Sequence, residues 1–536
     1  MTENINTELM DDFFKNIAKK WQDYIPYNFI EGIDLSLDQK KVIDLFEDQL
    51  MVMGCAGSGK SITLLYKMIR TMIAETEPKR MLYVSYNQSL IDDAKKRARR
   101  SEEFKSLETR HHVEIKTFHY MVHDLLKMMK ENVKPIFMSY EKMEKNTDDA
   151  VGRVYSAMVP YITPGEPRYE GLASKERLFK THTASFVRDE IFWMKANGFV
   201  EREDYINATR NGRGSIPRLE KNQRNTIFDI FLKYQDDMKY KYHDDMDLED
   251  YALRLLQKGT CIPESLKYDY VFVDEVQDLQ PMQVKALVAI TKGKLVISGD
   301  NKQRIYKTTN HTYEALGLGR LKRRTLVENY RSTKPIMSLA HKIRFDDVEQ
   351  DKEKHIKYVR DGKEPIIKHF AKAKDYMNYI VDRIKSIHEQ DPKATVAVIV
   401  RNDDQVKRGE HNPIQEALKR SFLTIDIVKY GAKYSYEKKE KQIVVTDPYS
   451  VKGLEFDYVI ITDFDKFHYP LRSKFEELDK AHGEQSQDNE NYLRDRENII
   501  NNEKRILYVA MTRAKKELDL VYCTFSEEAR CTFLDD

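Results

Sequence analysis

Residues 48–61 read Asp-Gln-Leu-Met-Val-Met-Gly-Cys-Ala-Gly-Ser-Gly-Lys-Ser and join a short apolar run to the start of a helical pattern. The apolar run, Leu50 to Met53, predicts a buried parallel strand, and the helical pattern begins at Ile62. The residues between them match G-x-x-x-x-G-K-[ST], a phosphate-binding loop, in its required context of strand, loop and helix. A Gly-rich turn at a helix start can arise by chance, but here all four motif positions are present.

The spacing of this loop suits a bound triphosphate. Backbone N–H groups can curl around the phosphates along Gly54, Cys55, Ala56, Gly57, Ser58 and Gly59, and the helix that follows directs its positive end at them. Lys60 can then reach the β- and γ-phosphates, and the Ser61 hydroxyl can ligate Mg²⁺. We therefore predict that the chain binds a nucleoside triphosphate with Mg²⁺.

Length and composition narrow the class of protein. The chain has 536 residues, which exceeds a single core, and it is 41% hydrophobic and 33% charged, as expected of a globular protein with a charged surface. Lys and Arg number 90 against 88 Asp and Glu, a net charge of +2. A nucleic-acid partner would therefore have to be held by local basic patches.

The cysteines and the hydropathy of the sequence indicate the cellular compartment of the protein. The four cysteines show no paired metal-ligand spacing, and Cys55 lies inside the phosphate loop, which argues against a disulfide framework and fits a reducing cytoplasm. No apolar run approaches the roughly 18 residues of a membrane span. We expect a cytoplasmic protein with no membrane partner.

Polar side chains follow two further predicted strands. The strand predicted at residues 81–85 is followed by Tyr86 and Asn87, and the strand predicted at residues 113–116 is followed by Thr117 and His119. In an open α/β sheet, ligands bind at the carboxyl ends of the strands. Polar residues there are as often capping groups as ligand contacts, so both alternatives stay open for each of them.

Two successive carboxylates at the end of a predicted strand complement the phosphate loop. The apolar strand predicted at 268–273 ends in Asp274 and Glu275. Asp274 can hold the Mg²⁺ shell, and Glu275 can polarise the water that attacks the γ-phosphate. Such carboxylates can also be helix caps, but two in succession after a buried strand, downstream of a phosphate loop, favour catalysis.

The remaining organisation is read from composition and periodicity. Residues 1–34 form a lead segment whose apolar face could dock on the core or on a partner. Residues 126–261 predict a helical insertion, in which the acidic run Asp244–Asp250 lacks the spacing of a calcium loop and reads as a solvated helix start. Residues 472–498 are polar and read as an exposed loop.

Together these motifs resemble the UvrD/Rep-like superfamily 1 helicases over residues 35 to 522. The motifs that carry the resemblance appear in the family's order, ending in Asn329-Tyr-Arg-Ser332, Lys452-Gly-Leu-Glu455 and Tyr508-Val-Ala-Met-Thr-Arg513. The resemblance implies an α/β fold of two RecA-like parallel-sheet domains that bind ATP between them. The first would be 35–125 with 262–334, interrupted by the insertion, and the second 335–536.

The resemblance also implies roles for single residues. Gln39 would read adenine, Tyr330 would stack on it and Glu455 would contact the ribose. Gln303 would sense the γ-phosphate, and two arginine fingers, Arg331 and Arg513, would stabilise its transferring charge. The nucleic-acid track would take Tyr86, Asn87, Thr117, His119 and Lys452.

Three departures from the family pattern are visible. Asp447 and Tyr449 replace the Thr and His of the family's Thr-x-His, and Lys307 follows Tyr306 where the family often has a Trp. Between Gly431 and Ile443 only a short segment stands where relatives carry a large second-domain insertion, and it is too short to form a core.

Three hypotheses about function follow. The first is an ATP-driven motor on single-stranded DNA, with 3′-to-5′ polarity as in the family and RNA not excluded. The second is an ATP-driven remodeller of a protein–nucleic acid complex, which would need a protein partner. The third is a non-catalytic binding module, against which the intact Lys60, Glu275 and Arg331 argue.

Overall fold

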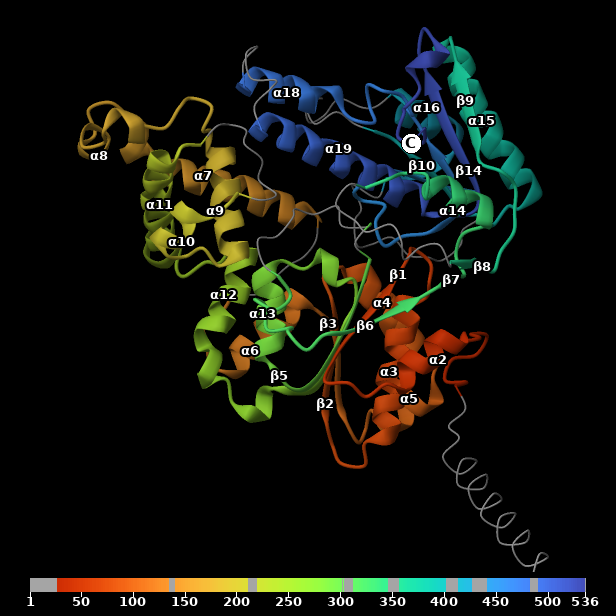
Figure 1. Cartoon of the computed structure of the whole chain (residues 1–536), viewed down its shortest axis with the longest axis horizontal. Helices are drawn as coiled ribbons and strands as arrows, with labels where there is room; N and C mark the ends of the chain where they lie inside the picture. Colours follow the sequence, from red (N-terminus) through yellow and green to blue (C-terminus); the bar gives the residue numbers. More distant parts are fainter. Residues whose placement is uncertain are drawn as a thin grey trace, which may run out of the picture.

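The computed structural model describes residues 27–134, 140–210, 219–300, 302, 312–345, 356–401, 413–426, 441–482 and 490–535 of the chain. Within these residues two six-stranded sheets form, and the strands of each pair in parallel (Figure 1). Helices cover the sheets, so the fold is α/β with two RecA-like domains. Residues 1–26 of the lead segment expected at 1–34 lie outside the described residues.

The first sheet places the phosphate-loop strand next to the edge strand β6. Its order is β3-β2-β4-β5-β1-β6, with strands β1 (Gln49–Gly54), β2 (Arg80–Ser85), β3 (His112–Thr117), β4 (Tyr268–Val273), β5 (Thr291–Gly299) and β6 (Lys322–Leu326). Strand β1 is flanked by β5 and β6. Its side chains alternate between two cores, because Leu50 and Val52 pack into one and Met51 into the other.

Helices fill both faces of this sheet. They are α2 (Leu37–Asp44), α3 (Lys60–Ala74), α4 (Gln88–Ala98), α5 (Glu102–Leu107), α6 (Phe118–Met128) and α13 (Pro281–Ala289). Helix α3 joins the core that holds Leu50, whereas α6 and α13 join the core that holds Met51. Burial on both faces explains why the strands read as continuous apolar runs in the sequence.

The segment between β3 and β4 is helical, as the sequence predicts. It contains α7 (Tyr140–Ile162), α8 (Pro167–Glu170), α9 (Ala184–Asn197), α10 (Arg202–Asn207), α11 (Lys221–Asp236) and α12 (Leu248–Lys258). Helices α7, α9 and α11 share a core of their own that includes Trp193 and Tyr234. Helix α12 instead joins the core of the first sheet through Tyr251 and Leu255. We therefore propose that the separate insertion ends before α12.

The prediction that the acidic run at the start of α12 is a solvated helix start is wrong. The ammonium of Lys195, which is fully buried on α9, lies 2.6 Å from a carboxylate oxygen of Asp247 and 2.8 Å from one of Asp250. The Tyr234 hydroxyl also donates to Asp247, at 3.0 Å. The run carries negative charge because it meets a buried cation from a distant helix, which the local sequence does not reveal.

The second sheet follows the same plan. Its order is β11-β12-β10-β13-β14-β9, with strands β9 (Ile366–Phe370), β10 (Val396–Ile399), β11 (Leu423–Asp426), β12 (Gln442–Thr446), β13 (Phe456–Ile461) and β14 (Ala514–Cys523). Its helices are α14 (Lys334–Ala340), α15 (Ala373–Gln390), α16 (Pro413–Ser421), α18 (Arg472–His482) and α19 (Glu490–Met511). A small parallel pair, β7 (Glu328–Asn329) and β8 (Lys357–Tyr358), stands apart from both sheets.

Helices α18 and α19 show that the exposed loop expected at 472–498 is wrong for residues 472–482 and 490–498, while residues 483–489 lie outside the described residues. Leu478 is fully buried, Tyr492 is 7% exposed, and the Tyr492 hydroxyl donates to Asp479 across the two helices at 2.7 Å. A few anchors of this kind are enough to hold helices rich in Glu, Lys and Arg, which are good helix formers. Low hydrophobicity was therefore a poor guide to loop structure here.

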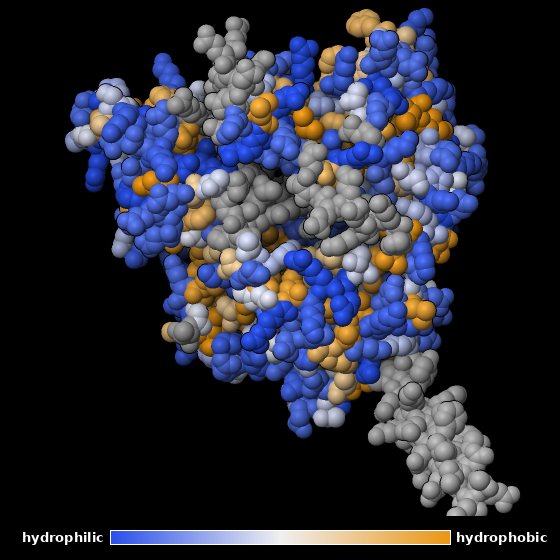
Figure 2. All heavy atoms as spheres, viewed as in Figure 1, coloured by the Kyte–Doolittle hydropathy of each residue, from blue (hydrophilic) through white to orange (hydrophobic). Residues whose placement is uncertain are grey.

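The second-domain connection is short, as the sequence indicates. Strand β11 ends at Asp426 and β12 begins at Gln442, and residues 427–440 between them lie outside the described residues. The face in Figure 2 is mostly hydrophilic, with apolar residues in small groups. Among the described helices, none has the length and apolar character needed to cross a membrane.

Replacing Lys195 with alanine should destabilise the first domain. The substitution leaves the Asp247 and Asp250 carboxylates buried without their cation, a loss of about 3–5 kcal/mol. Thermal unfolding followed by circular dichroism should show a lower midpoint. The matched control is Lys175→Ala, because Lys175 is exposed on the same insertion. An unchanged midpoint in Lys195→Ala would show that the buried pair contributes nothing net.

Candidate nucleotide site at the phosphate loop

The phosphate loop begins where β1 ends, at Gly54, and finishes at Gly59, the N-cap of α3. Gly57 and Gly59 have φ of 81° and 80°, which favours glycine. A Cβ on Gly57 would lie 2.5 Å from Cβ of Arg331, and one on Gly59 would contact Nε2 of Gln39. Both positions therefore favour glycine for conformation, and Gly57 requires it for space as well.

The loop presents donors suited to an anion. Within the described chain no side chain caps α3, so the N–H groups of its first turn keep their positive end uncovered. Lys60 is 5% exposed, and its ammonium donates to the carbonyl oxygens of Gly54 at 3.0 Å and Cys55 at 3.1 Å. The lysine is thus held inside the loop, so these residues fit the triphosphate that the motif predicts.

Asp274 lies at the carboxyl end of β4 and is 1% exposed. Its carboxylate accepts hydrogen bonds from the Ser298 hydroxyl at 2.7 Å and the Tyr83 hydroxyl at 2.9 Å, and Ser61 also bonds to it. Burial and the neighbouring Glu275 raise the pKa of Asp274, and the hydroxyl donors offset only part of this. An all-oxygen pair of Ser61 and Asp274 fits Mg²⁺, whose charge would favour the ionised carboxylate.

Glu275 is held in a strained backbone conformation. Its φ is 51°, in the left-handed region that non-glycine residues rarely adopt and that often marks a functional site. Burial would raise the pKa of its carboxyl, but the charges of Lys60 and Lys452 and a hydrogen bond from Gln277 hold this pKa below its ordinary value. Glu275 is therefore ionised at neutral pH, as a general base must be.

The Asn329–Ser332 segment docks directly on the phosphate loop. The Asn329 amide donates to the carbonyl oxygen of Ala56 at 2.6 Å, and the Tyr330 N–H donates to that of Gly57 at 3.0 Å. The other end of the Asn329 amide accepts from the N–H groups of Arg331 and Ser332, both at 3.1 Å. Asn329 was quoted in the motif without a role, and its fully buried amide is the link that sequence reasoning missed.

The structure brings the predicted adenine residues together beside this segment. Ser36 and Gln39 form a capping box at the start of α2, and the Gln39 amide donates to the Ser58 carbonyl at 3.4 Å. The Tyr330 hydroxyl donates to Glu328 and also bonds to Ser36. Gln39 and Tyr330 thus lie next to each other at the loop, and adenine recognition by them stays a prediction.

The predicted arginine fingers occupy different environments. Arg331 lies 2.8 Å from a Glu455 carboxylate oxygen, and Lys515 lies 3.1 Å from the other, so Glu455 of the second domain holds Arg331 at the cleft. Burial would raise the pKa of Glu455, but these two cations lower it to about 2. Arg513 is 1% exposed and donates to carbonyl oxygens of Val509 and Leu454, at 2.9 and 3.3 Å.

Most of the residues predicted for the nucleic-acid track are less accessible than expected. His119 is fully buried against Tyr86, and burial lowers its pKa to about 4. Thr117 is 1% exposed, and the Asn87 side chain caps α4 by accepting from the Ser89 N–H. In this conformation the His119 ring supports Tyr86 from inside the core, and a direct contact of His119 with nucleic acid stays a prediction. Contacts by Tyr86, Asn87 and Thr117 stay predictions.

Lys452 lies in the cleft between the domains. It is 7% exposed and pairs with the Asp278 carboxylate of the first domain, three residues beyond Glu275. Burial raises the pKa of Asp278 to about 6, with Lys452 opposing the shift. The lysine is thus placed beside the hydrolysis residues, and its predicted phosphate contact to nucleic acid stays a prediction. Gln303 and the segment after it lie outside the described residues.

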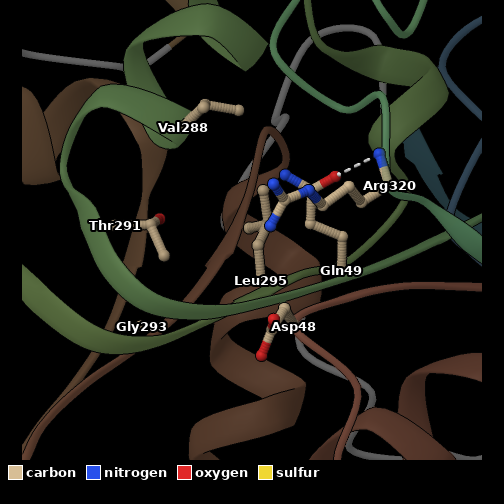
Figure 3. A pocket seen from close by; sticks show the side chains of 7 residues that line it. All are labelled: Asp48, Gln49, Val288, Thr291, Gly293, Leu295 and Arg320. Atoms are coloured by element: carbon tan, nitrogen blue, oxygen red, sulfur yellow. Dashed lines mark hydrogen bonds between the residues drawn. The ribbon is translucent and has the colours of Figure 1, made fainter.

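A pocket at the opposite end of the first sheet contains none of these residues. It has a volume of about 230 Å³ and is lined by Asp48, Gln49, Val288, Thr291, Gly293, Leu295 and Arg320. Figure 3 shows Gln49 turned toward Arg320, whose N–H donates to the Gln49 side chain at 3.1 Å. The pocket lies where β1 begins, whereas the phosphate loop lies where β1 ends, so the pocket is separate from the nucleotide site.

The fold and the phosphate loop define a P-loop protein with two RecA-like domains. The model of the UvrD/REP helicase N-terminal domain matches residues 35–316, and that of the UvrD-like helicase C-terminal domain matches 324–441 and 410–524. The chain belongs to the UvrD/REP helicase family.

Two curated relatives are similar over about two thirds of the chain. They are the mitochondrial ATP-dependent DNA helicase HMI1 of Saccharomyces cerevisiae, 23% identical over 67% of this chain and 48% of that protein, and a probable DNA helicase II homolog of Mycoplasma capricolum, 23% identical over 67% and 47%. The chain thus spans about half the length of these relatives. The solved C-terminal domain of a possible DNA helicase from Lactobacillus plantarum aligns at 18% identity over 38% of this chain and 91% of that one, with a TM-score of 0.23, too low to bear on the fold.

Lys60→Ala and Glu275→Gln should both abolish ATP turnover, for different reasons. The first removes a phosphate contact, so nucleotide affinity and turnover should both fall. The second keeps the shape of the side chain and removes the base, so ATP should still bind. Fluorescent-nucleotide titration and steady-state hydrolysis measure the two effects. Near-normal hydrolysis in Glu275→Gln would contradict its assignment as the base.

Lys452→Gln distinguishes two roles of this lysine, one in the cleft beside Glu275 and one as a phosphate contact to a nucleic-acid strand. In the cleft, its charge holds the pKa of Glu275 low, so its loss should raise that pKa and move the acid limb of the kcat–pH profile to higher pH. The salt dependence of single-strand binding should not change. If Lys452 instead contacts a strand phosphate, the slope of log K against log salt should weaken by about 0.7 and the pH profile should stay in place.

Proposed function

We propose that this chain is an ATP-driven motor that acts on single-stranded DNA. The observation that carries the proposal is the assembly of one site from both domains: the phosphate loop and Glu275 come from the first, and Glu455, Lys452 and Arg513 come from the second. A site built this way is sensitive to the separation of the domains, so hydrolysis and domain movement are coupled.

The chain's residues divide the work of hydrolysis between them. The loop N–H groups and Lys60 bind and orient the phosphates, while Gln39 and Tyr330 hold the adenine ring. Mg²⁺, held by Ser61 and Asp274, would neutralise charge on the phosphate oxygens. Glu275, kept ionised, takes the proton of the attacking water, and Arg331 and Arg513 stabilise the charge that develops in the transition state.

DNA as the substrate is supported by the family and by the names of both relatives. The strand would run over the carboxyl ends of β2 and β3, where Tyr86, Asn87 and Thr117 lie, with 3′-to-5′ polarity expected from the family. The short connection between β11 and β12 supports a compact motor that grips the single strand and has little affinity for a duplex junction.

An ATP-driven remodeller of a protein–nucleic acid complex is the second candidate. It is favoured by the Asp447 and Tyr449 departure, because the Asp447 side chain is engaged by the N–H groups of Tyr449 and Ser450, at 2.8 and 3.0 Å. A side chain that closes its own turn in this way is a poor contact for a strand. Such a protein would hydrolyse ATP in response to a protein partner.

The ATPase rate with and without single-stranded DNA, followed by strand displacement on 3′- and 5′-tailed duplexes, tests the proposal. We expect the single strand to raise kcat and unaided unwinding to be modest, with the 3′-tailed duplex preferred. Glu275→Gln serves as the inactive control. An ATPase rate that ignores DNA would overturn the motor and favour the remodeller, and efficient unwinding would show a duplex-gripping surface elsewhere in the chain.

A further inference from the structure

Lys302 lies three residues beyond the end of β5 and is buried against the second domain. It is 5% exposed, and its ammonium lies 5.6 Å from the ring centroid of Phe345 and 5.8 Å from that of Tyr508. The two rings pack edge to face, with centroids 5.9 Å apart, and belong to the core of the second domain. A lysine of the first domain therefore sits on an aromatic pair of the second, within the range of a cation–π interaction.

A chain of hydrogen bonds leads from Lys302 back to the proposed base. The backbone N–H of Lys302 donates to the Asp300 carboxylate at 3.0 Å, and the backbone N–H of Asp300 donates to the Gln277 side-chain oxygen at 3.2 Å. The nitrogen of the same Gln277 amide donates to the Glu275 carboxylate. Because both ends of the amide are engaged, its orientation is fixed, and Glu275 is held by a side chain that Asp300 positions.

The aromatic side of this set of contacts leads to Arg513, the second predicted arginine finger. Tyr508 lies on the last turns of α19, which ends at Met511, and the Arg513 guanidinium donates to the carbonyl oxygen of Val509, next to Tyr508. One end of α19 therefore contacts Lys302 and orients Arg513. A shift of this helix relative to the first sheet would therefore displace the general base Glu275 and the arginine finger Arg513 together.

We propose that Lys302 is a positioning residue that couples the place of the second domain to the orientation of Glu275. The coupling runs through Asp300 and Gln277 on one side and through Phe345 and Tyr508 on the other. Lys302 does not touch the nucleotide in this proposal. The inference rests on the proposed function, because it assigns the route by which a bound strand that closes the cleft accelerates hydrolysis.

The test compares Lys302→Met with Lys302→Arg in the full chain. Methionine keeps the length of the side chain and removes the charge, whereas arginine keeps a cation over the rings. We expect Lys302→Met to lower the DNA-stimulated kcat about tenfold, the scale of one desolvated cation–π contact. ATP affinity, measured by fluorescent-nucleotide titration, should stay within twofold, and Lys302→Arg should recover most of the rate.

Two further variants separate coupling from a loss of folding. Lys285→Met, on the exposed face of α13, is the matched control and should leave rate and melting temperature unchanged. Phe345→Leu should lower the rate in the same direction, because it removes one of the two rings beneath the Lys302 ammonium, and the double variant should lose little more than Lys302→Met, because that substitution already removes the cation from both rings.

The outcomes separate this inference from the proposed function. A wild-type ATPase that DNA does not stimulate would overturn the proposed function. A stimulated wild type with Lys302→Met within twofold of it, or with no recovery in Lys302→Arg, would overturn the role of Lys302 alone. Losses in Lys302→Met and Phe345→Leu that multiply in the double variant would also overturn it.

Discussion

The docking of Asn329 on the phosphate loop is the interaction on which the rest of the site depends. One buried amide bonds to the loop carbonyl of Ala56 and to the N–H groups of Arg331 and Ser332. The Ser332 hydroxyl then donates to the carbonyl oxygen of Ala514 in β14, at 2.6 Å. A single turn thus ties the nucleotide loop to the second sheet, and a buried amide left without these partners would be costly.

Buried charge of both signs gives the cleft its chemistry. Glu275, Asp274 and Asp278 converge at the carboxyl end of β4, and burial alone would favour their neutral forms. Lys60 and Lys452 reach them from opposite domains, and their charges lower the pKa of Glu275. The base is therefore ionised most fully when both domains are in place, which makes the protonation state of the site part of the coupling.

The fold could be predicted from the sequence because its signals are local. Apolar strands, a Gly-rich loop and paired carboxylates at a strand end each carry their own meaning, and the structure places Gln39, Lys60, Asp274 and Tyr330 around one loop as expected. What could not be predicted depends on distant partners. The buried Lys195 gives the acidic run its place, the rings of Phe345 and Tyr508 give Lys302 its role, and the Tyr86 ring covers His119. Nothing near these residues in the sequence reports such contacts.

Hydrogen–deuterium exchange of Glu275→Gln with and without MgATP tests the shared site most directly. Because this variant should bind ATP without hydrolysing it, the bound state persists through the measurement. We predict slower exchange both in residues 54–63 of the first domain and in residues 451–456 and 512–516 of the second. Slower exchange confined to the first domain, with the second unchanged, would contradict a nucleotide site built from both.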